Sequence, residues 1–141
     1  MAVCESNVAM VISHALSGHA LQRALAIEQL GDVSNFTQAG TDWRARILIV
    51  GLEDDYAAVR QLAIRSLRKL DRFKELKFDS LALDSVRKTQ VETALRIWND
   101  SASDQVRARL AELLGDSGGD CEKLIGQIGS QRKNVNIFVL E

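Results

Sequence analysis

The sequence predicts an all-α protein, and three observations support this prediction. The chain of 141 residues contains no proline, and only 5% of its residues are aromatic. In most segments apolar residues recur at spacings of three and four, which is typical of amphipathic helices. Glycine follows several of these segments, as is usual where a helix ends. We therefore expect short helices separated by glycine-containing turns.

The first two helices are expected over residues 6–16 and 19–30. Gly18 separates them, and Gly31 ends the second. Residues 33–40 are rich in side chains that favour turns and should form a loop. The apolar residues of the second helix are Leu21, Leu25, Ile27 and Leu30.

Two further helices are expected over residues 42–52 and 53–70. The uninterrupted apolar run 47–50 in the first of them indicates burial on more than one side. The three acids at 53–55 favour a helix start, because they face the positive end of the helix dipole. Residues 71–80 would form either a short helix or an irregular plug between neighbouring helices.

The last part of the chain should contain helices over 83–98, 104–114 and 120–128. Residues 130–141 alternate weakly between apolar and polar side chains, which is the period of a strand. This tail would either dock as a cap or fray. The length of the chain fits one domain over residues 1–141.

One short pattern occurs three times in the sequence. The clearest copy lies in residues 52–70, and related copies lie in 22–31 and 106–115. The first copy precedes the clearest one by 37 positions and the third follows it by 47, an excess that matches the segment 71–80. Each copy follows another amphipathic helix, so the repeating unit is a helix pair. The matching residues are Arg23, Ala26 and Leu30, then Arg60, Ala63 and Leu67, and finally Arg107, Leu110 and Leu114.

These copies resemble the HEAT-repeat family, including the bacterial subgroup of phycobilisome-lyase type, over roughly residues 6–128. The resemblance implies a short right-handed α-solenoid of about three to three and a half pairs of helices, A and B. The pairs would cover residues 6–31, 41–70 and 83–115, with a half repeat at 120–129.

The resemblance also implies a polar ladder, in which an aspartate in the turn of a repeat meets the arginine of helix B. The first copy departs from this pattern, because it has Ser17, Gly18 and His19 in place of an acid before Arg23. The implied partners are Asp54 or Asp55 for Arg60, and Asp104 or Asp100 for Arg107.

Basic residues are concentrated in the middle of the chain. Residues 60–77 contain seven Arg and Lys against two acids, whereas residues 1–59 contain three against seven. On one continuous helix, four of these cations would share a side opposite the apolar stripe. That side would either be offered to a partner, as the B helices of the family are, or simply be solvated. The four cations are Arg65, Arg68, Lys69 and Arg72.

The sequence shows no catalytic constellation, and we expect no metal and no cofactor. His14 and His19 have no acid following them to complete a ligand set. Cys121 has no neighbouring base, and the paired acids Asp54 and Asp55 fit helix capping better than acid–base catalysis. Trp43 and Trp98 fall on predicted A helices, where tryptophan usually belongs to the core.

Composition sets the remaining expectations. The net charge of −1 gives no general attraction to nucleic acid, and no apolar run approaches the roughly 18 residues of a membrane span. Cys4 and Cys121 support neither a disulfide framework nor a zinc site, which favours a reducing cytoplasm.

The leading functional hypothesis is a non-enzymatic interaction module, monomeric or homodimeric. It would bind an acidic segment of a partner protein on the B-helix surface, through Arg65, Arg68, Lys69 and Arg72. One alternative is binding of a nucleic-acid backbone by the basic central helix. The other, which rests only on the family subgroup, is a lyase-like chaperone for a tetrapyrrole.

Overall fold

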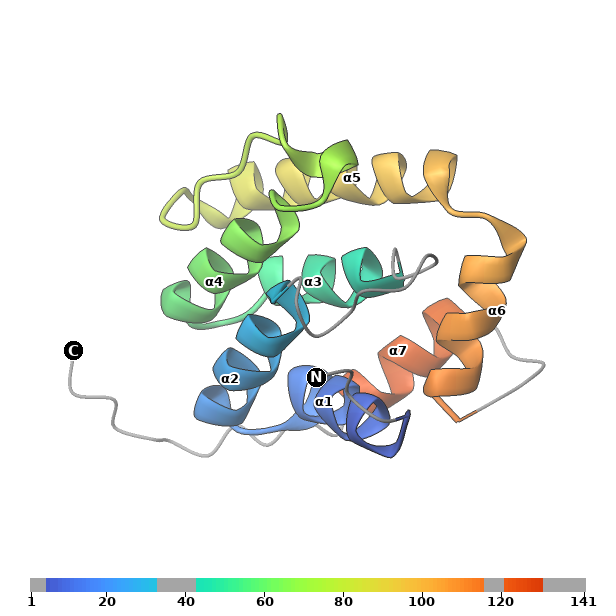
Figure 1. Cartoon of the computed structure of the whole chain (residues 1–141). Helices are drawn as coiled ribbons and strands as arrows, with labels where there is room; N and C mark the ends of the chain where they lie inside the picture. Colours follow the sequence, from blue (N-terminus) through green and yellow to red (C-terminus); the bar gives the residue numbers. More distant parts are fainter. Residues whose placement is uncertain (1–4, 33–42, 116–120, 131–141) are drawn as a thin grey trace.

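The described part of the computed structural model, residues 5–32, 43–115 and 121–130, is helical and contains no strand (Figure 1). The predicted all-α class is confirmed. The predicted loop 33–40 and all of the tail after residue 130 lie outside the described residues. The helices are α1 (Glu5–Ser17), α2 (Ala20–Gly31), α3 (Arg44–Leu52), α4 (Ala57–Leu67), the 3-10 helix η3 (Asp71–Phe73), α5 (Asp84–Ser101), α6 (Asp104–Leu113) and α7 (Cys121–Gly129).

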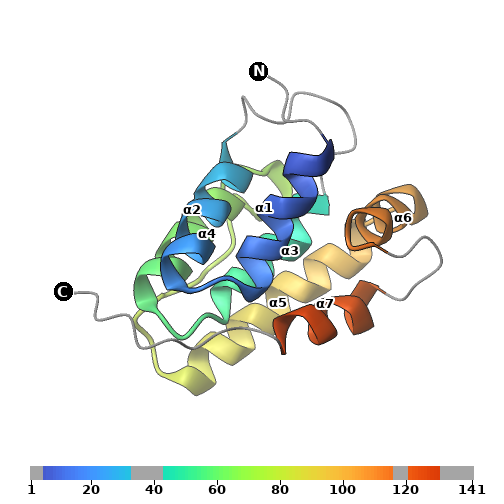
Figure 2. The ribbon, with the colours of Figure 1, turned by 90° about the horizontal axis from the view of Figure 1, so that it is seen from below.

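Helix α3 lies in the middle of the molecule. It packs against α1, α2, α4 and α5, and every one of its residues except Val50 is buried (Figures 1 and 2). The predicted burial of the run 47–50 on more than one side is confirmed for Ile47, Leu48 and Ile49. Because the helix is surrounded, most of the other elements are positioned by their contacts with it.

The remaining helices are arranged in pairs around α3. Consecutive helices α1 and α2 pack together, as do α3 and α4, and α2 lies beside α4. Helix α5 lies against α3 and η3. Helices α6 and α7 pack against each other and against α1, so the end of the described chain returns to its beginning (Figure 2).

Helices α2 and α4 run side by side in a defined register. A Cβ atom at Gly31 would overlap the Ser66 side chain, and the Ser66 hydroxyl donates a hydrogen bond of 3.5 Å to Ile27 O. Residues equated by the repeat are buried alike in these two helices. In the third copy Leu110 is buried, whereas Arg107 and Leu114 are partly buried. The buried equivalents are Arg23 and Arg60, Ala26 and Ala63, and Leu30 and Leu67.

The predicted helix over 53–70 is too long at both ends. At its start, the Asp54 carboxylate accepts a hydrogen bond from Tyr56 N, and this local turn delays the helix until Ala57. At its end, α4 stops at Leu67, and the chain turns so that Phe73 and Leu76 enter the core. No glycine or proline marks this end in the sequence.

Smaller differences concern other segments. Of residues 71–80 only 71–73 are helical, and α5 continues three residues beyond its predicted end at 98. Leu21 and Leu25 are 58% and 55% exposed, although both belong to the apolar pattern of the second predicted helix.

We predict that Gly31→Ala destabilises the protein by about 1–3 kcal/mol, because the added methyl group would meet Ser66, whose Cα would be only 3.2 Å away. Gly126→Ala in α7 is the matched control, since a Cβ there meets no atom within 4 Å. The control should stabilise the protein by roughly 0.5–1 kcal/mol through helix propensity. Urea denaturation measures both, and equal effects of the two substitutions would contradict the prediction.

Candidate functional site

The three repeated arginines all donate to backbone carbonyls near the turn before their own helix. Arg23 Nη1 donates to Gly18 O at 2.8 Å, and Arg60 Nη1 donates to Asp54 O at 2.7 Å. Arg107 Nη2 donates to Asn99 O at 3.2 Å. Each arginine therefore ties its helix to the end of the preceding one, which orders the turns.

A buried ion pair links the first helix pair to the second. Arg23 Nε and Nη2 donate to the two carboxylate oxygens of Asp54 at 2.6 and 3.1 Å, and both side chains are 1% exposed. The Arg23 guanidinium also lies 5.7 Å from the centre of the Tyr56 ring. The first copy has no acid of its own, but the turn of the second copy supplies one.

Arg60 connects α4 to the segment that follows it. Its Nη1 also donates to Asp55 O at 3.0 Å, and its Nε donates to Ser80 O at 3.0 Å. The pKa of Arg60 lies below its usual value, chiefly because of burial and secondly because of the nearby Arg87. The side chain of Asp55, an implied ladder partner, is exposed.

The predicted ladder partners of the third copy are placed differently. Asp104 and Asp100 are both exposed, and Asp104 lies in the first turn of α6. The side chain that caps α6 is Ser103, whose hydroxyl accepts a hydrogen bond from Val106 N. Arg107 also lies over the Trp98 ring, 5.8 Å from its centre.

We predict that Asp54→Asn destabilises the protein by about 3–5 kcal/mol, because it leaves the Arg23 guanidinium buried without a counter-charge. Asp55→Asn should change stability by less than about 0.5 kcal/mol, since Asp55 is exposed and its bond to Arg60 uses the backbone. Chemical denaturation measures both. Arg23→Met combined with Asp54→Asn should cost less than the sum of the single changes; strict additivity would show that the pair is not coupled.

The predicted basic cluster does not occupy one helical face. Arg65 is on α4, Arg68 follows the last helical residue, Lys69 is in the turn and Arg72 is in η3. The predicted common face is therefore wrong, because α4 ends at Leu67. All four side chains remain exposed.

Three of the four cations are held by backbone carbonyls. Arg68 Nε donates to Leu76 O at 3.3 Å, Lys69 Nζ to Gly31 O at 3.2 Å, and Arg72 Nη1 to Ser101 O at 3.1 Å. Gly31 and Ser101 end α2 and α5, where the helix dipole favours a cation. These bonds use neutral acceptors. Within the described residues, none of the four cations has a carboxylate partner.

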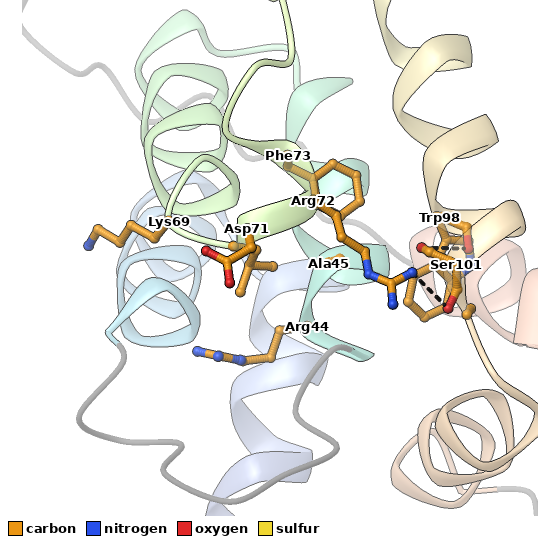
Figure 3. A pocket seen from close by; sticks show the side chains of 10 residues that line it. Arg44, Ala45, Lys69, Asp71, Arg72, Phe73, Trp98 and Ser101 are labelled. Carbon is orange, nitrogen blue, oxygen red and sulfur yellow. Dashed lines mark hydrogen bonds between the residues drawn. The ribbon is translucent and has the colours of Figure 1, made fainter.

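A cavity of about 290 Å³ adjoins two of these cations, Lys69 and Arg72. In Figure 3, Arg72 extends toward Ser101, Lys69 extends to the opposite side, and Asp71 lies between them. The buried Arg44 lines the cavity from α3, and its Nη1 donates to Leu30 O at 2.9 Å. Arg65 and Arg68 do not line it.

The cavity has an excess of positive charge. Three cations and one acid line it, and that acid, Asp71, also forms an ion pair of 3.0 Å with Lys74. Lys69 and Arg72 each use one donor on a carbonyl, whereas an ammonium offers three donors and a guanidinium five. Donors therefore remain for an anionic ligand.

The other residues considered in the sequence serve structural purposes where they are described. The His19 side chain accepts a hydrogen bond from Gln22 N and caps α2. Trp43 and Trp98 are buried. No group of three or more potential metal ligands occurs among the described residues, and the side chain of Cys121 lies outside them.

A second ion pair was not predicted from the sequence. Arg46 of α3 donates twice to the Glu122 carboxylate of α7, at 3.0 and 2.6 Å. The pKa of Glu122 lies below its ordinary value, first because Arg46 donates to the carboxylate and then because Arg46 and Arg107 are positive, although partial burial opposes the shift. This pair attaches α7 to the central helix.

We predict that this ion pair gives a pH-dependent contribution to stability. Because the folded pKa of Glu122 is lowered, the contribution is complete above the pKa of the unfolded chain, about 4.3, and is lost as the pH falls through the folded value. Glu122→Gln should therefore lower stability at neutral pH, by less than about 1 kcal/mol because Glu122 is half exposed. Urea midpoints of parent and variant should converge toward pH 3; a constant difference would contradict the prediction.

Comparisons with protein-family models, with curated proteins and with solved structures give no match for this chain. In the part of the chain that the structure describes, no helix has both the length and the apolar character needed to cross a membrane.

Proposed function

We propose that this chain is a non-enzymatic cytoplasmic interaction module that binds an acidic segment of a partner protein. The binding site would be the cavity beside η3, with Lys69 and Arg72 as the residues that contact the segment. The observation that carries the proposal is that both cations are exposed, are held in place by carbonyls and have no carboxylate partner within the described residues.

Holding the cations in place favours binding in two ways. The side chains of Lys69 and Arg72 are already ordered by Gly31 O and Ser101 O, so a ligand need not bear the whole entropic cost of ordering them. Neither cation has a carboxylate partner within the described residues, so their positive charge also speeds the approach of an anionic partner.

The geometry favours an extended segment over a single carboxylate. Lys69 and Arg72 point in different directions from the two sides of Asp71 (Figure 3). Because the two cations extend to opposite sides, acids spaced along an extended chain suit them better than a single carboxylate does (Figure 3). Arg68 is also exposed and directly precedes Lys69 in the sequence, so it adds to the local positive charge.

We further propose that the first two helix pairs are HEAT-like repeats and that the chain is built on a short right-handed solenoid. The equal burial of equated residues in α2 and α4, together with the contact between these two helices, supports this. In the third copy α5 lies beside α3, whereas the partners of α6 are α1 and α7. The stack would therefore be closed by its last helices.

A protein segment fits the charges better than a nucleic-acid backbone does. Glu28, Asp32 and Glu75 are exposed acids on the segments next to the cations, so the basic surface is short. A short acidic segment can place its carboxylates at Lys69 and Arg72 alone, whereas a phosphate backbone continues past them and meets these acids. Nucleic-acid binding generally requires a longer basic track.

We predict that Lys69→Glu combined with Arg72→Glu weakens binding of a fluorescent peptide of about eight glutamates at least about tenfold at low salt. Fluorescence anisotropy measures the affinity, and thermal melts followed by circular dichroism verify that the variant is folded. Lys88→Glu combined with Arg96→Glu is the matched control, because both cations are exposed on α5 away from the cavity lining.

Three results would overturn the proposal. They are no binding of the peptide by the parent, an equal loss in the control variant, or tighter binding of a single-stranded oligonucleotide of the same charge. An oligonucleotide that binds with a steep dependence on salt would favour the nucleic-acid alternative.

A further inference from the structure

Helices α2 and α4 present one shared surface whose two halves carry matching positions. The residues of this surface are spaced three or four apart on the side of each helix that faces away from the core. Each of these positions on α2 has an equivalent 37 positions later on α4. We call this surface the outer face. Its residues are Leu21, Leu25 and Glu28 on α2, and Ala58, Leu62 and Arg65 on α4.

The outer face is more apolar than an exposed helix surface usually is. Leu21 and Leu25 are 58% and 55% exposed, Ala58 is exposed, and Leu62 is partly buried against the core. Contiguous exposed apolar side chains can mark an interaction surface. Both helices lie together along one side of the molecule in the two perpendicular views (Figures 1 and 2).

The charges on the outer face are opposite at equivalent positions. Glu28 and Arg65 are both exposed, and among the described residues neither has an ion-pair partner. Ser66 lies level with the segment between Ile27, whose carbonyl its hydroxyl meets, and Gly31, so Glu28 and Arg65 lie at similar heights on the two helices.

This arrangement is complementary to itself. A two-fold axis that runs along the seam between the two helices would place α2 of one copy over α4 of the other. Glu28 of each copy would then face Arg65 of the other, and the large Leu21 would face the small Ala58. Leu25 would face Leu62 in the same way. The two-fold axis repeats each of these contacts.

We propose that the outer face joins two copies of this chain in a symmetric dimer. We identify the partner on this face as a second copy, because a single two-fold rotation pairs Glu28 with Arg65 and also places the large Leu21 opposite the small Ala58. The proposal does not depend on the acidic-segment site, which uses Lys69 and Arg72 on the cavity beside η3.

The size of the face limits the strength of the dimer. Helices of 12 and 11 residues are about 18 and 16 Å long, and two neighbouring helices give a face roughly 20 Å wide. The product of this length and width is below the roughly 800 Å² that each partner buries in a standard interface. We therefore expect a weak dimer, with a dissociation constant in the micromolar range.

Charge exchange tests the dimer directly. Sedimentation equilibrium from about 1 μM to 1 mM should show a monomer–dimer equilibrium for the parent. Glu28→Arg alone and Arg65→Glu alone should each weaken it by about tenfold or more, because each places like charges opposite one another twice. The double variant should restore the parent affinity to within about threefold.

Apolar and charge controls complete the experiment. Leu25→Ser should weaken the dimer, whereas Met10→Ser, an exposed apolar residue on α1, should not. Glu92→Arg on α5 changes the charge equally and should leave the dimer unchanged. A parent that remains monomeric at 1 mM, or a double variant no better than the single variants, would overturn the proposal. Neither result would affect glutamate-peptide binding through Lys69 and Arg72.

Discussion

The buried ion pair between Arg23 and Asp54 sets the relation between the first two helix pairs. Two charged groups that are each 1% exposed must stay together, because separating them would leave a charge in the core. The bidentate geometry allows one orientation of Asp54 relative to α2. That orientation constrains the register of α2 and α4, on which the outer face depends.

Close packing then excludes other registers of α2 relative to α4. Gly31 and Gly51 allow α2 and the central helix to approach their neighbours, since a Cβ at Gly51 would meet Ile27 and Ala63. Beyond α4 the chain does not continue into another helix of the same layer. Instead Arg60 and Arg68 hold residues 74–80 through carbonyls, and this segment lies where the repeat pattern has its ten-residue insertion.

The sequence predicts features that depend on local spacing, and much less those that depend on partners distant in the chain. Helix positions follow from apolar periodicity, and the run 47–50 correctly indicates a helix buried on several sides. The pattern does not reveal that Leu21 and Leu25 face outward, because amphipathic spacing identifies apolar residues without saying which ones are covered. Arg46 and Glu122 are 76 positions apart, and each resembles an ordinary surface charge until the fold joins them. The sequence predicts one helical face for the basic cluster because no glycine or proline indicates that α4 ends at Leu67.

The return of α6 and α7 to α1 affects how this protein is made. In an open stack of helix pairs each unit touches only its neighbours, so a nascent chain can build its structure stepwise. Here α1 has partners that are synthesised about a hundred residues later. When the chain emerges from the ribosome, α1 and α2 can associate early, but the side of α1 that contacts α6 and α7 remains uncovered until those helices have been synthesised. Contacts between residues so far apart in the sequence slow folding. Docking of α6 and α7 onto α1 is then the step that completes the native structure.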